Sequence, residues 1–458
     1  MICRITLIVV LTGIAASADA DDGPPTFAFV NAGIVRADAN RVEPGQTIIV
    51  TGTRIIEIGP SAELLPPPGA VVIDAGNAYV SPGLAEMHAH VPHHDAGETY
   101  LHDVLFLWVA NGVTTIRGMN GEPEHLELRD RIARGEVLGP RLLTAGPPFI
   151  GRRIKTAAEA GARAAAQADA GYDLIKVHMG ISRTVYDAVA QTARRRGIPF
   201  AGHVAEDVGL WHALESGQAS IDHLDGYMPA LVGDDAEIEG VGYGLLGAPL
   251  TPFIDEEKFI AVAHSTRVAG VWNAPTLSMA EKFIGPIDVE ATALGLKYMP
   301  PKMVRGWIVA AQGFQKSIDD PEAAQKFLDY RKQLVKSLHD VGAGLLLASD
   351  APQILNVPGF SIHRELEMLV EAGLTPAEAL TTGTVNPAIF VARSDTFGRV
   401  AVGLDADLVL TAENPLQDLA TLRDPLGVMV RGRWLPAEEL QAGLARIAQR
   451  NQAGNRVE

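Results

Sequence analysis

The chain has 458 residues, of which 47% are hydrophobic and 20% are charged. This composition excludes a disordered chain, and the length allows one large domain with a smaller one beside it. Acidic residues outnumber basic residues by 55 to 38, giving a formal net charge of −17. Because nucleic acids and anionic membranes would be repelled overall, we expect a small-molecule substrate and neither of those partners. The composition is also compatible with a homo-oligomer.

The first 20 residues predict a secretory signal peptide. Arg4 precedes an apolar core at residues 5–14, and small residues flank cleavage points after Ala18 and Ala20. We therefore expect a secreted, periplasmic protein whose mature chain begins at Asp19 or Asp21. The one cysteine, Cys3, lies before the apolar core, so the mature chain would have no disulfide.

Both ends of the remaining chain are rich in short β-type segments. Residues 27–82 alternate apolar and polar side chains between Gly, Asn and Asp turns, and the same texture returns from residue 398 onwards. Neither piece has enough strands to bury a face alone. We predict one small, discontinuous β-sandwich domain from residues 21–82 and 398–458, the alternative being two unrelated β extensions.

Between these ends, residues 83–397 alternate apolar runs with helical patterns. Eight runs are strand candidates, and several of the helical stretches between them end at a glycine. This pattern predicts an α/β fold with a (β/α)₈ TIM barrel, whose active site lies at the carboxyl ends of the strands. A doubly wound open sheet is the alternative, but no G-x-G-x-x-G follows the first strand.

The first of these runs, VSPGLAEMHAH, ends in His88 and His90. In a strand, side chains two residues apart point to the same side, so these imidazoles would face one point. Two ordinary histidines are the alternative for such a pair considered alone. Polar residues in or at the ends of later runs favour the metal-binding interpretation.

Those polar residues come from four further strand candidates. The LIKVH run contains Lys176, the next two runs supply His203 and His223, and the eighth supplies Asp350. A lysine inside an apolar strand is costly to bury unless it is paired or chemically altered. Carboxylation by carbon dioxide would turn Lys176 into a carboxylate that can bridge two metal ions. The alternative is a structural lysine that reaches a salt bridge at the strand end.

Taken together, PGLAEMHAH, LIKVH, GHV, DHLDG, ASDA and the later GRVAVGLDADLVLTAENPL resemble the amidohydrolase superfamily, in its imidazolonepropionase-like and prolidase-like branch. The resemblance covers nearly the whole mature chain. It implies that His88, His90 and Asp350 bind one metal ion, that His203 and His223 hold a second, and that carboxylated Lys176 bridges them. Where some dipeptidase members carry Ala-Thr-Gly-Gly, this chain reads HMGISRT, so substrate preference cannot be carried over.

The residue types predict hydrolysis of a C–N bond. A hydroxide bridging two divalent ions, which nitrogen-rich ligands suggest are zinc, would attack an amide or peptide carbonyl. Asp350 would act as general base and then as general acid. Tyr227 is a candidate for stabilising the oxyanion, with an ordinary packed tyrosine as the alternative.

We therefore expect a metal-dependent, dipeptidase-like amidohydrolase acting on a dipeptide or an N-acyl amino acid. The alternatives are a cyclic-amide hydrolase, an isomerase or lyase on the same barrel, and a catalytically silent binder. The sequence leaves the roles of His93, His94 and His178 open. The long segments 225–269 and 278–343 follow the sixth and seventh runs and are expected to roof the pocket.

Overall fold

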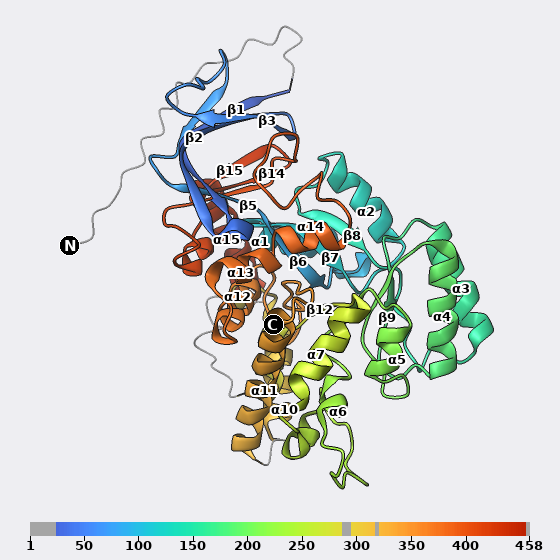
Figure 1. The fold of residues 1–458 in the computed structure, drawn as a ribbon. Helices are drawn as coiled ribbons and strands as arrows, with labels where there is room; N and C mark the ends of the chain where they lie inside the picture. Colours follow the sequence, from blue (N-terminus) through green and yellow to red (C-terminus); the bar gives the residue numbers. More distant parts are fainter. Residues whose placement is uncertain (1–23, 286–294, 317–319, 455–458) are drawn as a thin grey trace.

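The computed structural model describes residues 24–285, 295–316 and 320–454. The predicted signal peptide lies outside these residues. The chain is an α/β protein in which a β-rich part, coloured at both ends of the sequence scale, lies against a larger part with helices around its strands (Figure 1). The predicted α/β class is confirmed.

The β-rich part is one sheet built from both ends of the chain. Its hydrogen-bonded order is β15-β14-β13-β5-β1-β2-β3, and β4 also pairs with β1. The strands are β1 (Thr26–Arg36), β2 (Arg41–Thr51), β3 (Arg54–Pro60), β4 (Val71–Asp74), β5 (Tyr79–Pro82), β13 (Leu408–Thr411), β14 (Gly427–Val430) and β15 (Arg433–Pro436). Strand β5 joins the two ends, because it runs parallel to β1 and antiparallel to β13.

We predicted a sandwich of two sheets here, and the described strands instead form this single ladder. Strand β1 pairs with β4 through residues 27–30 and with β5 through residues 33 and 34, so β5 connects both chain ends in one hydrogen-bonded sheet. Buried side chains from both chain ends, including Phe29, Ile48, Leu408 and Met429, still share one hydrophobic core. The two chain ends therefore share one sheet and one core, as expected because neither end has enough strands to bury a face alone.

The larger part contains two parallel sheets. One has the order β6-β7-β8 and the other β12-β11-β10-β9. The strands are β6 (Leu84–Ala89), β7 (Val113–Gly118), β8 (Arg141–Thr144), β9 (Ile175–Val177), β10 (Phe200–Gly202), β11 (Ser220–Asp222) and β12 (Trp272–Ala274).

Isolated parallel bridges connect the edges of these two sheets. Ala145 pairs with Leu174 between β8 and β9. Leu345 pairs with Asn273 of β12, and Ala351 pairs with Ala89 of β6. The eighth predicted run, residues 344–351, thus lies between β12 and β6, but it is held by single bridges and is not a regular strand.

Helices surround these strands (Figure 1). They are α1 (Glu98–Ala110), α2 (Glu124–Ala133), α3 (Ala157–Asp169), α4 (Arg183–Arg196), α5 (Leu210–Glu215), α6 (Tyr227–Leu231), α7 (Lys258–Ala269), α8 (Leu277–Ile284), α10 (Pro301–Lys316), α11 (Pro321–Asp340), α12 (Phe360–Glu371), α13 (Pro376–Thr382), α14 (Val385–Phe390) and α15 (Ala437–Gly454). No helix in the described ranges is both long enough and apolar enough to cross a membrane.

Local sequence signals fix several helix ends. The Ser182 hydroxyl accepts a hydrogen bond from the Val185 N–H at the start of α4, and Gly197 ends this helix with a φ of 66°. Thr156 caps α3 in the same way through the N–H of Glu159. These caps satisfy backbone donors that a helix start leaves free. The glycine stop predicted after α4 is confirmed.

A buried ion cluster connects the two parts of the molecule. Arg141 Nη2 on β8 lies 2.5 Å from Asp405 Oδ2 and 3.0 Å from Asp407 Oδ2, just before β13. The side chains of Asp405 and Asp407 are only 9% and 4% exposed. Arg141 is the cation that both carboxylates share, while Asp405 has a second ion pair to the half-exposed Arg54, at 3.1 Å.

We predict that Arg141→Leu lowers the free energy of unfolding by about 3–5 kcal/mol, because the buried Asp407 loses its ion pair and Asp405 keeps only the pair with Arg54. Urea unfolding measures this change. The control is Arg134→Leu, which removes exposed ion pairs to Glu127 and Glu136 and should change the free energy of unfolding much less, because solvent screens such pairs. Equal costs for the two variants would contradict a structural role for the Arg141 cluster.

Candidate metal centre

A cavity of about 300 Å³ lies where the parallel strands end, and all six predicted metal ligands line it. They are His88, His90, Lys176, His203, His223 and Asp350. Their positions follow from the topology: each lies in or just after a strand or, for Asp350, in the segment after Leu345. Because parallel strands share one carboxyl edge, residues far apart in sequence meet there.

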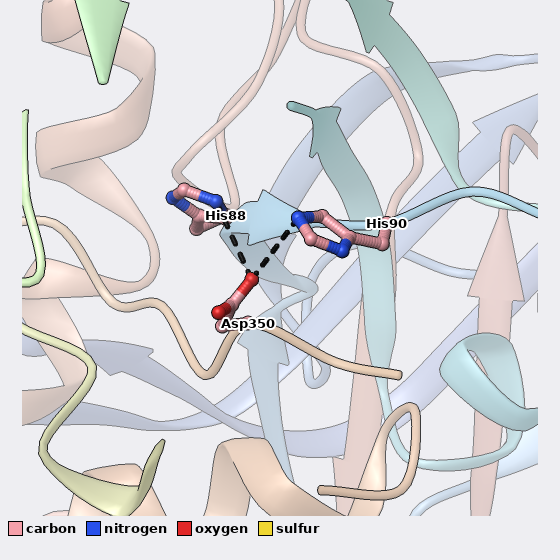
Figure 2. Close-up of side chains that lie close together, drawn as sticks. All are labelled: His88, His90 and Asp350. Carbon is pink, nitrogen blue, oxygen red and sulfur yellow. Dashed lines mark ion pairs between the residues drawn. The ribbon is translucent and has the colours of Figure 1, made fainter. Parts of the chain in front are cut away.

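Two imidazoles of this set face one carboxylate oxygen. Asp350 Oδ1 lies 3.4 Å from His88 Nε2 and 3.2 Å from His90 Nε2 (Figure 2). The three ligand atoms all lie within 4.8 Å of one another. Asp350 Oδ1 is buried and accepts no hydrogen bond, a state that is costly for a carboxylate oxygen. A cation between the three atoms would remove that cost.

Burial favours the uncharged state of the groups around the cavity. It lowers the pKa of His88, His203 and His223 well below the usual histidine range, with the Lys176 ammonium adding to the effect. Burial also raises the pKa of Asp350 to about 8, against the opposing effect of Lys176. Neutral imidazoles have a free lone pair, which is the form that binds a metal ion. The donor set therefore fits a divalent cation with nitrogen and oxygen ligands.

Lys176 reaches the same place from β9. Its Nζ lies 3.3 Å from His88 Nε2, its side chain is 1% exposed, and burial lowers its pKa to about 8. The path of this side chain requires a glycine on the neighbouring strand. At Gly202, where φ is 125°, a Cβ atom would lie 2.7 Å from Lys176 Cδ and 2.3 Å from the Val177 carbonyl oxygen.

The rings of His203 and His223 continue the cluster beyond Lys176. The ring centre of His223 lies 4.5 Å from that of His88 and 4.6 Å from that of His203. His178 adds a further ring 4.4 Å from His203 and also lines the cavity. The six predicted ligands and His178 therefore form one polar surface of the cavity, which we call its floor.

Three of the imidazoles have a polar neighbour at Nδ1, which is a hydrogen-bond partner for His203 and His223 and an ion-pair neighbour for His88. His88 Nδ1 lies 2.9 Å from Asp222 Oδ2, His203 Nδ1 lies 2.6 Å from Asp225 Oδ2, and His223 Nδ1 lies 2.9 Å from Thr276 Oγ1. Occupied Nδ1 atoms leave Nε2 for the cavity, which is the arrangement that orients histidine ligands in metal sites. The His88–Asp222 contact is an ion-pair distance without hydrogen-bond geometry.

Asp222 also joins a buried network below the cavity. Its Oδ1 accepts hydrogen bonds from Arg117 Nη2 at 3.1 Å and from the Ser220 hydroxyl at 2.8 Å. Burial opposes ionisation of Asp222, but Arg117 and Lys176 outweigh this effect and lower its pKa. Asp222 is therefore a buried carboxylate in its charged form.

Our sequence interpretation missed Arg117, Asp222, Asp225 and Thr276. Two signals were present: Asp222 and Asp225 flank His223 in SIDHLDG, and Arg117 interrupts the apolar run VTTIRG just as Lys176 interrupts LIKVH. A charged residue inside a buried strand needs a partner of opposite charge. Arg117 and Asp222 are such a pair, on different sheets.

The structure does not support the catalytic role predicted for Tyr227. This side chain is fully buried, donates a hydrogen bond to Asn273 Oδ1 at 2.8 Å, and contacts Thr266 Oγ1 at 3.0 Å. It is not among the residues that line the cavity. Gly226, with a φ of 81°, begins α6 and carries the chain away from the strand end. Tyr227 is therefore a core residue, and the packed-tyrosine alternative holds.

His93 and His94 also lie outside the lining of the cavity. His94 Nδ1 lies 3.0 Å from Glu122 Oε2, and His93 Nε2 lies 3.2 Å from the carbonyl oxygen of Asn120. The two long segments, in contrast, do reach the cavity. Leu245 and Met279 are among its lining residues, so residues 225–269 and 278–343 both contribute to the wall of the cavity.

An α/β chain with imidazole, lysine and carboxylate groups at the carboxyl ends of its parallel strands has the features of a metal-dependent hydrolase on a TIM-barrel-type fold. The family model of the amidohydrolase family matches residues 79–435. The chain belongs to this family.

Solved structures of similar fold cover almost the whole chain. Bottromycin amidohydrolase has a TM-score of 0.70 and 25% identity, over 94% of this chain and 91% of that one. The putative prolidase from Bifidobacterium longum has a TM-score of 0.68 and 24% identity, over 93% and 100% of the two chains.

Curated relatives match only in part. An adenine deaminase from Rubrobacter xylanophilus is 30% identical over 107 residues, which are 22% of this chain and 18% of that protein. Ochratoxinase from Aspergillus niger is 26% identical over 136 residues, which are 29% of this chain and 27% of that protein.

We predict that Tyr227→Phe destabilises the protein without slowing catalysis. The change removes the hydroxyl that donates to Asn273, so a buried acceptor is left unpaired at a cost of about 1–3 kcal/mol. Thermal unfolding and kcat, measured on the same preparation, test both parts. A fall in kcat of about a hundredfold, in a variant that keeps its fold, would restore the catalytic assignment.

Proposed function

We propose that this chain is a metal-dependent hydrolase that cleaves a carbon–nitrogen bond of a small amide, such as a dipeptide or an N-acyl amino acid. The observation that carries the proposal is the convergence of His88 Nε2 and His90 Nε2 on Asp350 Oδ1, a buried oxygen without a hydrogen bond. Membership of the amidohydrolase family supports it.

In this proposal, His88, His90 and Asp350 would hold one divalent ion, and His203 and His223 would hold a second. Lys176, carboxylated on Nζ, would supply oxygen ligands to both. Zinc suits this nitrogen-rich donor set. The ions would supply a nucleophile from water at neutral pH and polarise the substrate carbonyl.

Carboxylation also answers an electrostatic problem at Lys176. As an ammonium, its Nζ lies 3.3 Å from a nitrogen of His88 that is proposed to bind metal, so its charge would repel the cation. As a carbamate it would offer oxygen ligands and a negative charge. A pKa lowered to about 8 by burial makes the neutral amine, the form that reacts with carbon dioxide, accessible.

The remaining steps belong to side chains of this chain. Asp350 takes a proton from the attacking water and passes it to the leaving nitrogen. Asp222, Asp225 and Thr276 fix the imidazole rings through Nδ1 and so keep Nε2 directed at the cavity. The cavity walls hold the substrate against this floor.

Two further features belong to the proposal. The bridges of Leu345 and Ala351 support a barrel that closes through residues 344–351. We also propose that residues 1–20 direct export of the protein to the periplasm, as their charged start and apolar core predict.

A panel of dipeptides, N-acyl amino acids, uncharged N-acyl amides and a cyclic amide tests the proposed activity. We predict hydrolysis of at least one linear amide, its loss after dialysis against a chelator, and its return when zinc is restored. Activity that survives complete metal removal would contradict the proposal. Hydrolysis of the cyclic amide alone would favour the imidazolonepropionase-like alternative.

The role of Lys176 has its own test. We predict that Lys176→Ala loses most activity and at least one metal ion, and that acetate or propionate restores part of the rate by supplying the missing carboxylate. Lys176→Arg should not be rescued, because it keeps the charge and fills the space. Near-normal turnover of Lys176→Ala, with two metal ions and no added acid, would show that Lys176 is structural.

A further inference from the structure

The walls of the cavity differ from its floor in being apolar. One wall consists of Met119, Pro148, Ile150 and Met179. These residues follow β7, β8 and β9 in the chain. A second wall consists of Leu245, Leu246, Met279 and Phe283. These residues follow β11 and β12.

The strand order places these walls on different sides of the floor. Strand β10, which precedes His203, lies between β9 and β11 in its sheet. Loops after β7 to β9 and loops after β11 and β12 therefore approach the floor from different directions. A bound amide over the floor would have one of its flanking groups against each wall.

The second wall is part of a packed cluster. Met279 and Phe283, on α8, are 3% and 7% exposed, and they pack with Phe327 of α11. The ring of Phe283 also lies 5.1 Å from that of Phe314 on α10. This wall is therefore a fixed hydrophobic surface, and it gains free energy from covering apolar groups of a ligand.

Charged groups that could bind a charged substrate are absent from the described parts of both walls. Along the described lining, no arginine occurs and Lys176 is the single lysine. The carboxylates are Asp225, which contacts His203, and Asp350, which faces His88 and His90. A substrate carboxylate would lose its water against apolar atoms without gaining a cation, which is unfavourable. An ammonium would meet the same difficulty.

The neutral polar groups of the lining are Asn120 and Gln353. Amide side chains donate and accept hydrogen bonds without charge, so they suit hydroxyl or amide groups of a neutral ligand. Arg152 is the cation to consider outside the lining, since its charge helps to lower the pKa of His178. Arg152 is exposed and does not itself line the cavity, so it is tested as a variant below.

We propose that the substrate is an uncharged amide whose scissile bond joins two apolar groups, one for each wall. This inference rests on the proposed function and narrows its substrate class, because free dipeptides and N-acyl amino acids carry charges that the walls do not match. The specificity-determining residues are those of the walls, with Leu245, Met279 and Phe283 forming the roof side.

Three ligands with one carbon skeleton test the proposal on the metal-loaded enzyme. They are 3-phenylpropanoyl-leucinol, which is neutral, 3-phenylpropanoyl-leucine, which adds a carboxylate, and phenylalanyl-leucine, which adds an ammonium as well. We expect kcat/KM to fall at least about tenfold with the carboxylate, and to fall further with the ammonium. A carboxylate or dipeptide substrate that is hydrolysed as well as the neutral amide would overturn the proposal.

Variants of one wall residue provide a matched comparison. Leu245→Arg places a cation in the roof and should shift the kcat/KM ratio toward 3-phenylpropanoyl-leucine by about tenfold or more. Leu245→Gln is polar but neutral and should leave this ratio close to that of the wild type. Arg152→Gln should leave all three substrates unaffected, and a selective loss of carboxylate hydrolysis would instead identify Arg152 as its binding group.

Calorimetric binding of the same three ligands separates this inference from the proposed function. If none is hydrolysed but the neutral ligand binds at least about tenfold more tightly than the charged ones, the proposed activity fails and the inference stands. If hydrolysis occurs and the charged ligands bind more tightly, the activity stands and the inference is wrong.

Discussion

The candidate metal centre depends on one buried carboxylate. Asp222, at the end of β11, contacts Arg117 of β7, His88 of β6 and Lys176 of β9. These contacts connect the three-stranded sheet to the four-stranded sheet below the cavity floor. Without Asp222, the guanidinium of Arg117 would be a buried and unpaired charge, at a cost of about 3–5 kcal/mol.

The groups next to Asp222 show how burial determines the charge state of the residues in the cavity floor. Burial disfavours the charged forms of His88, His203, His223 and Asp350 alike. A fold that buries so many polar atoms in one region needs an interaction that compensates for their lost hydration. Divalent cations bound by neutral imidazoles and carboxylates provide such an interaction, and their binding free energy then also stabilises the fold.

The sequence predicted the metal-ligand candidates at the cavity floor but not the charged pair Arg117 and Asp222 that lies below them. Strand-end histidines and Lys176 are visible because they interrupt apolar runs, and the structure does bring all six candidates to one cavity. Asp222 and Arg117 were missed because their meaning lies in a contact between two strands 105 residues apart in sequence. The role of Tyr227 was predicted from its position four residues after His223, but a separation in sequence does not say where a side chain points. The backbone turn at Gly226 directs Tyr227 into the core. The single sheet of the β-rich part likewise depends on which strands β5 pairs with, and alternating side chains do not encode that choice.

The metal content of the purified protein tests the central claim most directly. Elemental analysis of freshly isolated enzyme, combined with an accurate protein concentration, gives the number of ions per chain. The account predicts close to two divalent ions, mainly zinc, with both lost from His88→Ala at the chelator concentration that the wild type withstands. A fully active enzyme with one ion per chain, or with none, would contradict it.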